Sequence, residues 1–259
     1  MRESTPRHWQ DFWEEAYRHG LDDVYDNDGR LVREIAALGP LPGKRILEVG
    51  AGSGRDAVAL ARAGAEVWTL DYVPGSLELT RLAAGEAGVD VVTVCGDGLG
   101  MPFADVVFHQ GLLEHFREPL HLLCENVRVL RPGGALVVDV PQTFHYYTVG
   151  KQVLIRLNRW FAGWETQFTA AELEGLLREA GTTIERSYGD WMVPGLWYRA
   201  LRKLVLRHTG RRLPKYPRVL WPLGPLGGAW RRRFGRTRLS LYTTPTIGTI
   251  GRKPEHGGA

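Results

Sequence analysis

Short runs of apolar, often β-branched residues alternate with amphipathic segments over most of the chain. Five of these runs have the length and composition of buried strands, at 45–52, 66–71, 89–97, 105–111 and 135–141. Three intervening segments have apolar positions at a helical period, at 55–64, 75–88 and 119–133. Strands that alternate with helices in this way predict an α/β fold with a mainly parallel sheet.

The pattern changes after the fifth predicted strand. Residues 142–168 are rich in aromatic side chains and predict a long loop. Thr169 and Glu172 match a Thr-x-x-Glu capping box, which predicts a helix over 169–180. Two more strands are predicted, at 182–191 and 240–253. Residues 255–259 are predicted to be a frayed tail. The sequence therefore predicts a sheet of seven strands.

A glycine-rich turn follows the first predicted strand. The motif ILEVGAGSG places Gly50, Gly52 and Gly54 directly after Glu48. Because glycine has no side chain, a ligand can approach the backbone of such a turn closely. The dinucleotide fingerprint G-x-G-x-x-G would need a glycine at position 55, where this chain has Arg55. The turn predicts a nucleotide-like ligand, and Arg55 disfavours NAD, FAD and an oxidoreductase.

Two further carboxylates stand at predicted strand ends. Asp71 ends the second strand, 19 residues after Gly52, where a carboxylate can accept hydrogen bonds from both hydroxyls of a ribose. Asp97 follows the third strand, where it can accept an amino hydrogen from adenine. Capping of a local turn is the alternative for both. Since the carboxyl ends of parallel strands meet at one edge, these residues predict a crevice for a ligand that contains ribose.

Five motifs occur in order along the chain: ILEVGAGSG, TLDY, VCGDG, HQGLLEHF and VRVLRPGGALVVDVP. On these motifs the chain resembles the class I S-adenosylmethionine-dependent methyltransferases of the small-molecule, ubiquinone/menaquinone-methyltransferase-like type. The resemblance covers residues 30–189 and a last strand. It implies a Rossmann-like sheet of seven strands, mostly parallel with the last strand antiparallel, and helices on both faces. It also implies S-adenosylmethionine as cofactor and S-adenosylhomocysteine as product.

The resemblance assigns cofactor contacts residue by residue. It places the methionine portion against the first strand end and its turn, at Glu48, Gly50, Ala51, Gly52 and Gly54. Asp71 and Tyr72 would bind the ribose. Asp97 and Gly98 would face the adenine, although the segment MPFADVVF is shorter than is usual before the fourth strand.

Two other groups of cofactor contacts follow from the same resemblance. Gln110 and Gly111, at the end of the fourth strand, would supply backbone contacts near the sulfonium. In similar proteins an N-terminal helix covers the cofactor. Trp13 and Tyr17 of WQDFWEEAY are therefore the candidate lid residues.

Methyl transfer to a hydroxyl needs a proton acceptor, and a neutral histidine suits this role near neutral pH. Three histidines are the catalytic candidates, at His109, His115 and His145. Each also has a structural interpretation, because His109 falls within a predicted strand and His115 can hold its loop through a backbone hydrogen bond. The transfer itself depends mainly on the alignment of the reactants.

The aromatic segment 142–168 follows the end of a predicted strand, the edge at which open α/β sheets bind substrates. Its candidate substrate contacts are Tyr146, Tyr147, Trp164 and Glu165. Aromatic faces at this edge can also surround a cationic methyl donor. Packing of the loop against itself is the alternative interpretation.

Charge is distributed unevenly. Residues 1–190 hold 18 Lys and Arg against 28 Asp and Glu, whereas residues 191–254 hold 15 basic residues and no acidic residue. Within the basic part, 196–208 places apolar residues, including the candidate substrate contact Trp197, on one helical face and basic residues on another. The region predicts a lid that balances the acidic part, a dock for an anionic membrane surface, or an RNA-binding surface.

These patterns divide the chain into five parts: an N-terminal helical lid (1–40), a cofactor-binding core (41–190) with the aromatic insert (142–168), a basic amphipathic insertion (191–238), a final core strand (239–254) and a tail (255–259). The composition, with 44% hydrophobic and 24% charged residues, is that of a globular chain. Two isolated cysteines, Cys95 and Cys124, predict buried thiols in a reducing compartment.

The sequence therefore predicts an enzyme that methylates an oxygen or carbon atom of a small-molecule or lipid-linked acceptor. The alternatives are a non-catalytic S-adenosylmethionine-binding sensor or assembly protein, and an RNA methyltransferase that uses the basic region. Because no signal peptide or spanning segment is evident, a cytoplasmic location is predicted, with peripheral binding at the inner membrane face as a variant. No cluster of metal ligands is evident, so the sequence predicts no metal.

Overall fold

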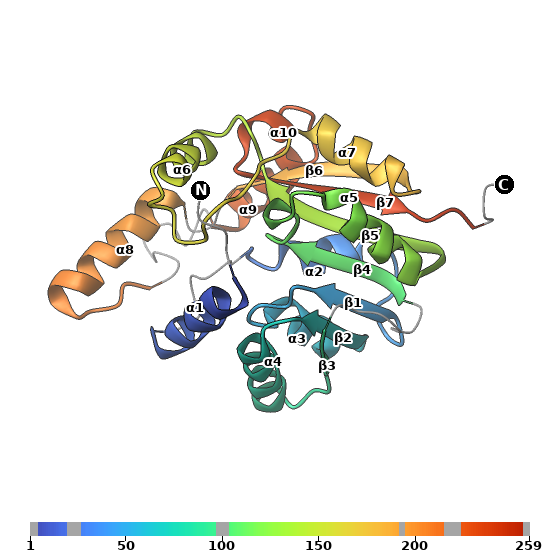
Figure 1. Ribbon diagram of the computed structural model, residues 1–259, viewed down its shortest axis with the longest axis horizontal. Coiled ribbons are helices and arrows are strands. Elements are labelled where there is room, and N and C mark those ends of the chain that lie inside the picture. Colours follow the sequence, from blue (N-terminus) through green and yellow to red (C-terminus); the bar gives the residue numbers. More distant parts are fainter. Residues whose placement is uncertain (1–4, 20–26, 97–103, 192–194, 215–223, 256–259) are drawn as a thin grey trace.

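Residues 5–19, 27–96, 104–191, 195–214 and 224–255 are described by the computed structural model. One sheet of seven strands, in the order β3-β2-β1-β4-β5-β7-β6, forms its centre (Figure 1). The strands are β1 (Arg45–Val49), β2 (Glu66–Asp71), β3 (Val92–Cys95), β4 (Ala104–Gln110), β5 (Leu130–Pro141), β6 (Thr183–Asp190) and β7 (Thr246–Arg252). Pairs among β1 to β5 are parallel, whereas β7 is antiparallel to both β5 and β6. The predicted sheet is confirmed.

Helices cover both faces of the sheet, as predicted. The helices that flank it are α2 (Arg30–Ala36), α3 (Arg55–Arg62), α4 (Pro74–Ala87), α5 (Pro119–Val129) and α7 (Ala170–Glu179). Ile46 of β1 packs with buried residues of α2 and α3, such as Leu31 and Leu60. The next residue, Leu47, points to the opposite face and shares a core with Leu123 of α5 and with α7. This alternation places an apolar layer on each face of the same strand.

Local signals begin and end several of these helices where the sequence indicates. The hydroxyl of Thr169 accepts a hydrogen bond from the Glu172 backbone at 3.2 Å, and the Glu172 carboxylate accepts one from the Thr169 backbone at 2.8 Å. This capping box confirms the predicted start of α7. Gly88 has a φ of +64° and ends α4 in the left-handed conformation that glycine favours.

Three predicted boundaries are wrong. Residues 130–133 belong to β5 rather than to the preceding helix, because Leu130 pairs with Ala104 of β4. A helical turn, α10 (Ser240–Thr243), precedes β7 and shortens the predicted last strand. The predicted loop 142–168 contains α6 (Tyr146–Arg156), whose buried face carries the polar residues Thr148 and Lys151. A buried polar face hides the helical period from a search for apolar residues.

The two cysteines were expected to be buried, and this expectation is wrong. Both thiols, Cys95 at the end of β3 and Cys124 on α5, are exposed. Cys95 belongs to an edge strand, which has a neighbouring strand on one side only. The apolar neighbours of Cys124, Leu123 and Val127, point into the core, whereas Cys124 lies on the outer face of the helix.

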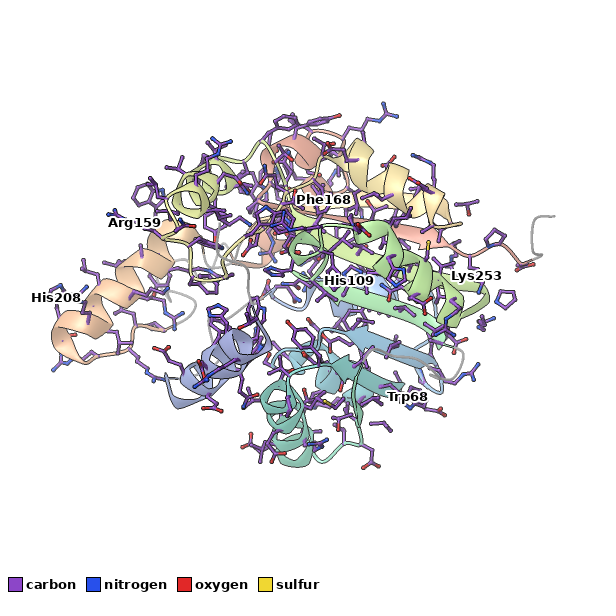
Figure 2. The ribbon with its side chains drawn as sticks, in the orientation of Figure 1. Trp68, His109, Arg159, Phe168, His208 and Lys253 are labelled. Carbon is purple, nitrogen blue, oxygen red and sulfur yellow. The ribbon has the colours of Figure 1, made fainter. Side chains whose placement is uncertain are left out.

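Several elements lie beyond the carboxyl ends of the parallel strands (Figure 1). These are α1 (Pro6–His19), the short 3-10 helix η1 (Leu113–His115), α6, α8 (Leu196–Thr209) and α9 (Gly224–Gly235). α8 extends furthest from the sheet, beside α6, and Figure 2 shows His208 of α8 and Arg159 after α6 in this outer part of the molecule. No described helix is long and apolar enough to span a bilayer. This edge of the sheet holds the candidate site.

Candidate active site

A cavity of about 900 Å³ lies at the carboxyl ends of β1, β2 and β4. Its volume is within the range of small-molecule and cofactor pockets. The cavity is lined by these predicted site residues: Trp13, Glu48, Gly50, Ala51, Gly52, Asp71, Tyr72, Gln110, Gly111 and His115. The parallel pairing of β1 with β2 and β4 brings these residues together, although they come from separate parts of the chain.

The glycine turn after β1 forms part of the cavity wall, and α1 packs against it. Gly50 and Gly52 have φ values of +70° and +54°, which favour glycine over other residues. A Cβ atom on Gly52 would lie 2.6 Å from the Trp13 ring. Gly54 does not line the cavity, because it begins α3, and a Cβ on it would overlap Thr80. The glycines therefore allow α1 and α4 to approach the turn closely.

Two buried carboxyl groups stand side by side in the cavity wall. The Glu48 carboxylate accepts a hydrogen bond from the backbone nitrogen of Ala57 at 3.2 Å, and Asp56 accepts one from the Asn27 side chain at 2.7 Å. Burial, and then the nearby Asp56, raises the pKa of Glu48 well above its ordinary value, and burial also raises the pKa of Asp56. A cationic group bound at this wall would favour the ionised forms of both groups.

Asp71 stands at the end of β2 and organises the neighbouring turn. One of its oxygens accepts hydrogen bonds from the Ser76 hydroxyl at 2.7 Å and the Gly52 backbone at 3.3 Å. The other accepts one from the Val73 backbone at 2.9 Å. Asp71 therefore links the glycine turn to the start of α4, as the turn-capping alternative requires, and its side chain also lines the cavity.

We expect Asp71→Asn to weaken S-adenosylhomocysteine binding about 10- to 100-fold. Each hydrogen bond to a charged group contributes about 1.5–3 kcal/mol, and about 1.4 kcal/mol corresponds to tenfold in affinity. Isothermal titration calorimetry measures the change. Glu66→Gln, at the exposed amino end of the same strand, is the matched control and should bind like the wild type. Wild-type affinity in Asp71→Asn would contradict the ribose assignment.

Gln110 connects the cavity to the buried interior. Its side-chain oxygen accepts a hydrogen bond from Asn27 at 2.7 Å, and the same amide of Asn27 binds Asp56. The adjacent Gly111 has a φ of +65°, and its backbone nitrogen donates to the carbonyl of Asp139 at 3.1 Å. These bonds hold the end of β4 in place beside the cavity.

His115 is the one of the three candidate histidines that lines the cavity. Its ring packs edge-on against Trp9 of α1, with the centroids 5.1 Å apart. Burial lowers the pKa of His115, while the nearby Glu165 opposes the shift. The ring is therefore neutral near pH 7, and its buried Nδ1 atom has no hydrogen-bond partner among the described residues.

The other two candidate histidines lie away from this cavity. His109 is fully buried within β4 (Figure 2), where burial lowers its pKa to about 3. Neither of its ring nitrogens has a hydrogen-bond partner in the described structure, so it is a core residue without polar contacts. His145 begins α6, and its Nδ1 accepts a hydrogen bond from the backbone of Tyr147 at 3.2 Å.

None of the predicted substrate contacts lines the cavity, which holds for Tyr146, Tyr147, Trp164, Glu165 and Trp197. Tyr146 and Trp197 are exposed to solvent. The ring of Trp164 faces the Arg117 guanidinium at 4.6 Å. Acceptor contact by these side chains stays a prediction.

Glu165 belongs to a buried polar cluster between the aromatic insert and η1. Its carboxylate binds Lys151 of α6 at 2.5 Å and Trp160 at 2.7 Å. Burial, and then the nearby Glu165, raises the pKa of Glu114 to about 8, so Glu114 is mostly protonated at neutral pH. The insert is fixed to the loop that carries His115 by a hydrogen bond from the backbone nitrogen of Thr166 to the carbonyl of Glu114, at 2.9 Å.

Some predicted site residues fall outside the described residues, and some residues of the cavity wall were not predicted. Asp97, Gly98 and the side chain of Tyr17 lie outside the described residues. Sequence reasoning missed Trp9 and Asp56, which both line the cavity. The spacing of four residues between Trp9 and Trp13 on α1 was a usable signal, because it places both rings on one helical face.

Comparisons with known proteins agree with this geometry. A family model described as a methyltransferase domain matches residues 47–138. The chain is similar to the ubiquinone biosynthesis O-methyltransferase of Ruegeria pomeroyi, with 32% identity over 163 residues, which are 59% of this chain and 65% of that protein. It is 30% identical to the protein of that description from Ruegeria sp. strain TM1040 over 178 residues, or 65% of this chain and 72% of the other.

A solved structure shows the same fold. Magnesium protoporphyrin IX methyltransferase from Synechocystis PCC 6803, with bound SAH, is 15% identical to this chain, and the match covers 95% of this chain and 84% of the other with a TM-score of 0.56. The curated relatives are longer than the matched part, since the chain spans 65% and 72% of the two named above.

The groups that line the cavity fit S-adenosylmethionine. The carboxyl groups of Glu48 and Asp56 suit its amino group, Asp71 suits a ribose, and the glycine turn leaves room for close contact. The fold, the cavity, the matching domain and the relatives therefore lead to one conclusion. The chain belongs to the class I S-adenosylmethionine-dependent methyltransferases, enzymes whose cofactor is S-adenosylmethionine.

Proposed function

We propose that the protein transfers a methyl group to a hydroxyl oxygen of a small apolar or lipid-linked acceptor. The observation that carries this proposal is a neutral histidine, His115, in the wall of the cofactor cavity. The curated relatives support oxygen as the acceptor atom, because they are O-methyltransferases of ubiquinone biosynthesis. When bound, S-adenosylmethionine supplies an electrophilic methyl group on a sulfonium sulfur.

In this proposal each wall of the cavity has a distinct task. Glu48 and Asp56 hold a cationic amino group, and Asp71 holds a ribose. Trp9 and Trp13 of α1 exclude water, because both side chains are buried in the cavity wall, Trp13 against the glycine turn and Trp9 against His115. Exclusion of water favours attack by the acceptor oxygen over side reactions.

His115 then serves as the proton acceptor. The His115 ring would accept the hydroxyl proton while the acceptor oxygen takes the methyl group, the bond from that carbon to sulfur breaks and S-adenosylhomocysteine leaves. The carbonyl groups of Trp164 and Gly111 hydrogen-bond the ring and favour its protonated form. These contacts orient the ring and stabilise the imidazolium that forms.

The surroundings of His115 favour an apolar acceptor. Trp9, Leu112 and Phe116 line the cavity beside it. Further out, Phe12 of α1 stacks on Phe161 of the aromatic insert, with ring centroids 5.3 Å apart. An acceptor that reaches His115 therefore meets mainly apolar and aromatic surface, which disfavours a highly charged substrate.

A transfer assay tests the proposed activity. The protein is incubated with methyl-labelled S-adenosylmethionine and an extract of the source cells, followed by organic and aqueous partition and counting of both phases. We expect label in the organic phase that depends on the protein and is lost with Asp71→Asn. Tight cofactor binding without transfer to any extract fraction would contradict the proposal and support a non-catalytic binding protein.

We also propose that α6 and α8 together dock on an anionic membrane surface. Residues Tyr146, Val149, Val153 and Leu157 form an exposed apolar stripe along α6, and Trp197, Leu201 and Leu204 form one along α8. Trp197 is 85% exposed. The two helices are neighbours at the outer end of the molecule (Figure 1), where Arg199 of α8 influences the pKa of Tyr147 on α6.

The positive charge of this surface favours an anionic membrane as its partner. Lys203 and Arg207 on α8 and Arg159 after α6 are exposed beside the apolar stripes, and the region 191–254 contains no acidic residue. Apolar side chains with basic neighbours suit the headgroup layer of an anionic bilayer, to which each Lys or Arg contributes about 1 kcal/mol. An acceptor dissolved in that layer would reach the same edge of the sheet as the cavity.

We expect Trp197→Ser/Leu204→Ser to weaken binding to phosphatidylglycerol vesicles by about tenfold or more, since burial of one large apolar side chain contributes about 1.5–3 kcal/mol. Vesicle sedimentation measures the change. Trp230→Ser/Leu239→Ser removes two exposed residues of the same types, outside α6 and α8, and should bind like the wild type. Equal binding by both variants, or binding of RNA in preference to vesicles, would contradict the proposal.

A further inference from the structure

A second, smaller pocket lies where α9 packs against the end of β6 and the start of α2. Its volume is about 80 Å³, several times the space that one water molecule needs. Five of its lining residues are arginines, at Arg30, Arg33, Arg231, Arg232 and Arg236. Its two carboxylates are Glu34 and Asp190. The pocket is therefore strongly cationic.

The two carboxylates are already neutralised by specific partners. Glu34 binds Arg186 at 2.7 Å. Asp190 binds Arg30 at 3.1 Å and lies 3.7 Å from Arg231. Arg30 and Arg231 also bind Asp139 and Asp28, at 2.6 Å and 2.5 Å. The inner part of the pocket is thus close to charge balance.

The positive charge in excess comes from three arginines at the rim. Arg33 of α2 contacts the backbone carbonyl of Asp28 and forms no ion pair with a carboxylate of the described residues. Arg232, in the last turn of α9, and Arg236, just after that helix, form no ion pair in the described part of the chain. Both line the pocket, four residues apart in the sequence, and like charges repel. An anion bound between them would relieve that repulsion.

The backbone holds the arginines in this arrangement. A Cβ on Gly235 would lie 2.5 Å from the carbonyl oxygen of Gly189, so the end of α9 contacts the end of β6 directly. Arginines in the last turn of a helix also interact favourably with the helix dipole, which explains their presence on α9. The helix dipole of α9 does not explain why Arg33, from α2, lines the same pocket as Arg232 and Arg236.

We propose that this pocket binds a phosphate-type oxyanion. Guanidinium groups recognise phosphate through paired, charge-assisted hydrogen bonds, and arginines converge here from α2 and α9. The phosphate belongs to a soluble phosphate ester or to a lipid headgroup. The pocket lies on the same edge of the sheet as the cavity. Arg30, which lines the pocket, donates its backbone N–H to the side chain of Asn27. The Asn27 amide in turn donates to Gln110, which lines the cavity, so a short chain of hydrogen bonds connects the two sites.

The test compares two double variants with equal loss of charge. Arg232→Ala/Arg236→Ala, the rim variant, removes two of the three rim arginines, whereas Arg233→Ala/Arg238→Ala removes two exposed arginines outside the pocket. Calorimetric titration with inorganic phosphate and with glycerol 3-phosphate, at constant ionic strength, measures the dissociation constants. We expect the rim variant to bind at least about tenfold more weakly than the wild type and the control variant to be unchanged.

The two sources of phosphate are separated by vesicle binding. If the rim variant loses binding to phosphatidylglycerol vesicles more than the control does while soluble esters bind weakly, the ligand is a lipid headgroup. If soluble esters bind tightly and vesicle binding is unaffected, the ligand is a soluble ester. Equal behaviour of the two variants in every titration would overturn the proposal, and the circular dichroism spectrum of each variant verifies its fold.

Discussion

Replacing Arg30 with methionine is expected to lower the free energy of unfolding by about 3–5 kcal/mol. The Arg30 guanidinium binds Asp139 of β5 at 2.6 Å and Asp190 of β6 at 3.1 Å. Its side chain is 8% exposed, and Asp139 is fully buried, with a further hydrogen bond from Tyr188 at 2.6 Å. Methionine keeps much of the side-chain volume but leaves Asp139 without its cation and Asp190 with Arg231 alone, at 3.7 Å. An uncompensated buried charge is the costly outcome of breaking such a pair.

The loss of stability should increase with pH. Burial raises the pKa of Asp139, and Arg30 opposes that rise. Without Arg30, the pKa of Asp139 in the folded protein moves further above its value in the unfolded chain. A group of this kind contributes stability at low pH that is lost as the pH rises through its folded pKa. The variant should therefore be closer to the wild type near about pH 5 than near about pH 8.

Urea unfolding of both proteins at the two pH values measures these differences. Arg81→Met is the matched control, because Arg81 is exposed on α4 and its pair with Glu78 is a surface pair. Such pairs contribute about 0–1 kcal/mol. A deficit for Arg30→Met as small as that of the control, or one that shrinks with rising pH, would contradict a stabilising role for this network.

The sheet could be predicted from the sequence because its signals are local. The runs from β1 to β5 are continuous and apolar, as strands covered on both faces require, and the glycine turn lies directly after β1. Glu48 and Asp71 were found for the same reason, since Asp71 is the last residue of its strand and Glu48 the last but one. Parallel pairing then brings their carboxyl ends to one edge without further information.

The elements that cover this edge could not be predicted in the same way. α6 buries Lys151, whose partner Glu165 lies 14 residues later, so the helix depends on a tertiary ion pair rather than on an apolar stripe. The positions of Trp9 and Asn27 likewise depend on how α1 and α2 pack on distant parts of the chain.

His115→Gln is expected to lower kcat about 10²- to 10⁴-fold, the range that general base catalysis contributes. Glutamine retains polarity and similar bulk but accepts a proton poorly. The affinity for S-adenosylhomocysteine should change little, because the carboxyl groups of Glu48 and Asp71 are unaltered. A loss in kcat with preserved cofactor affinity therefore separates proton acceptance from a merely structural role in the loop.

The pH profile provides the sharper criterion. Because burial lowers the pKa of His115 below its ordinary value of 6.5, kcat/KM of the wild type should fall as the pH is lowered through that pKa and the ring is protonated. His115→Gln should lose this acid limb, since its side chain does not titrate. His121→Gln, which changes another histidine of the same cavity, should retain both the rate and the limb. If His115→Gln kept the wild-type kcat, the acceptor would lose its proton to another group or to solvent, and the proposed role of His115 would be wrong.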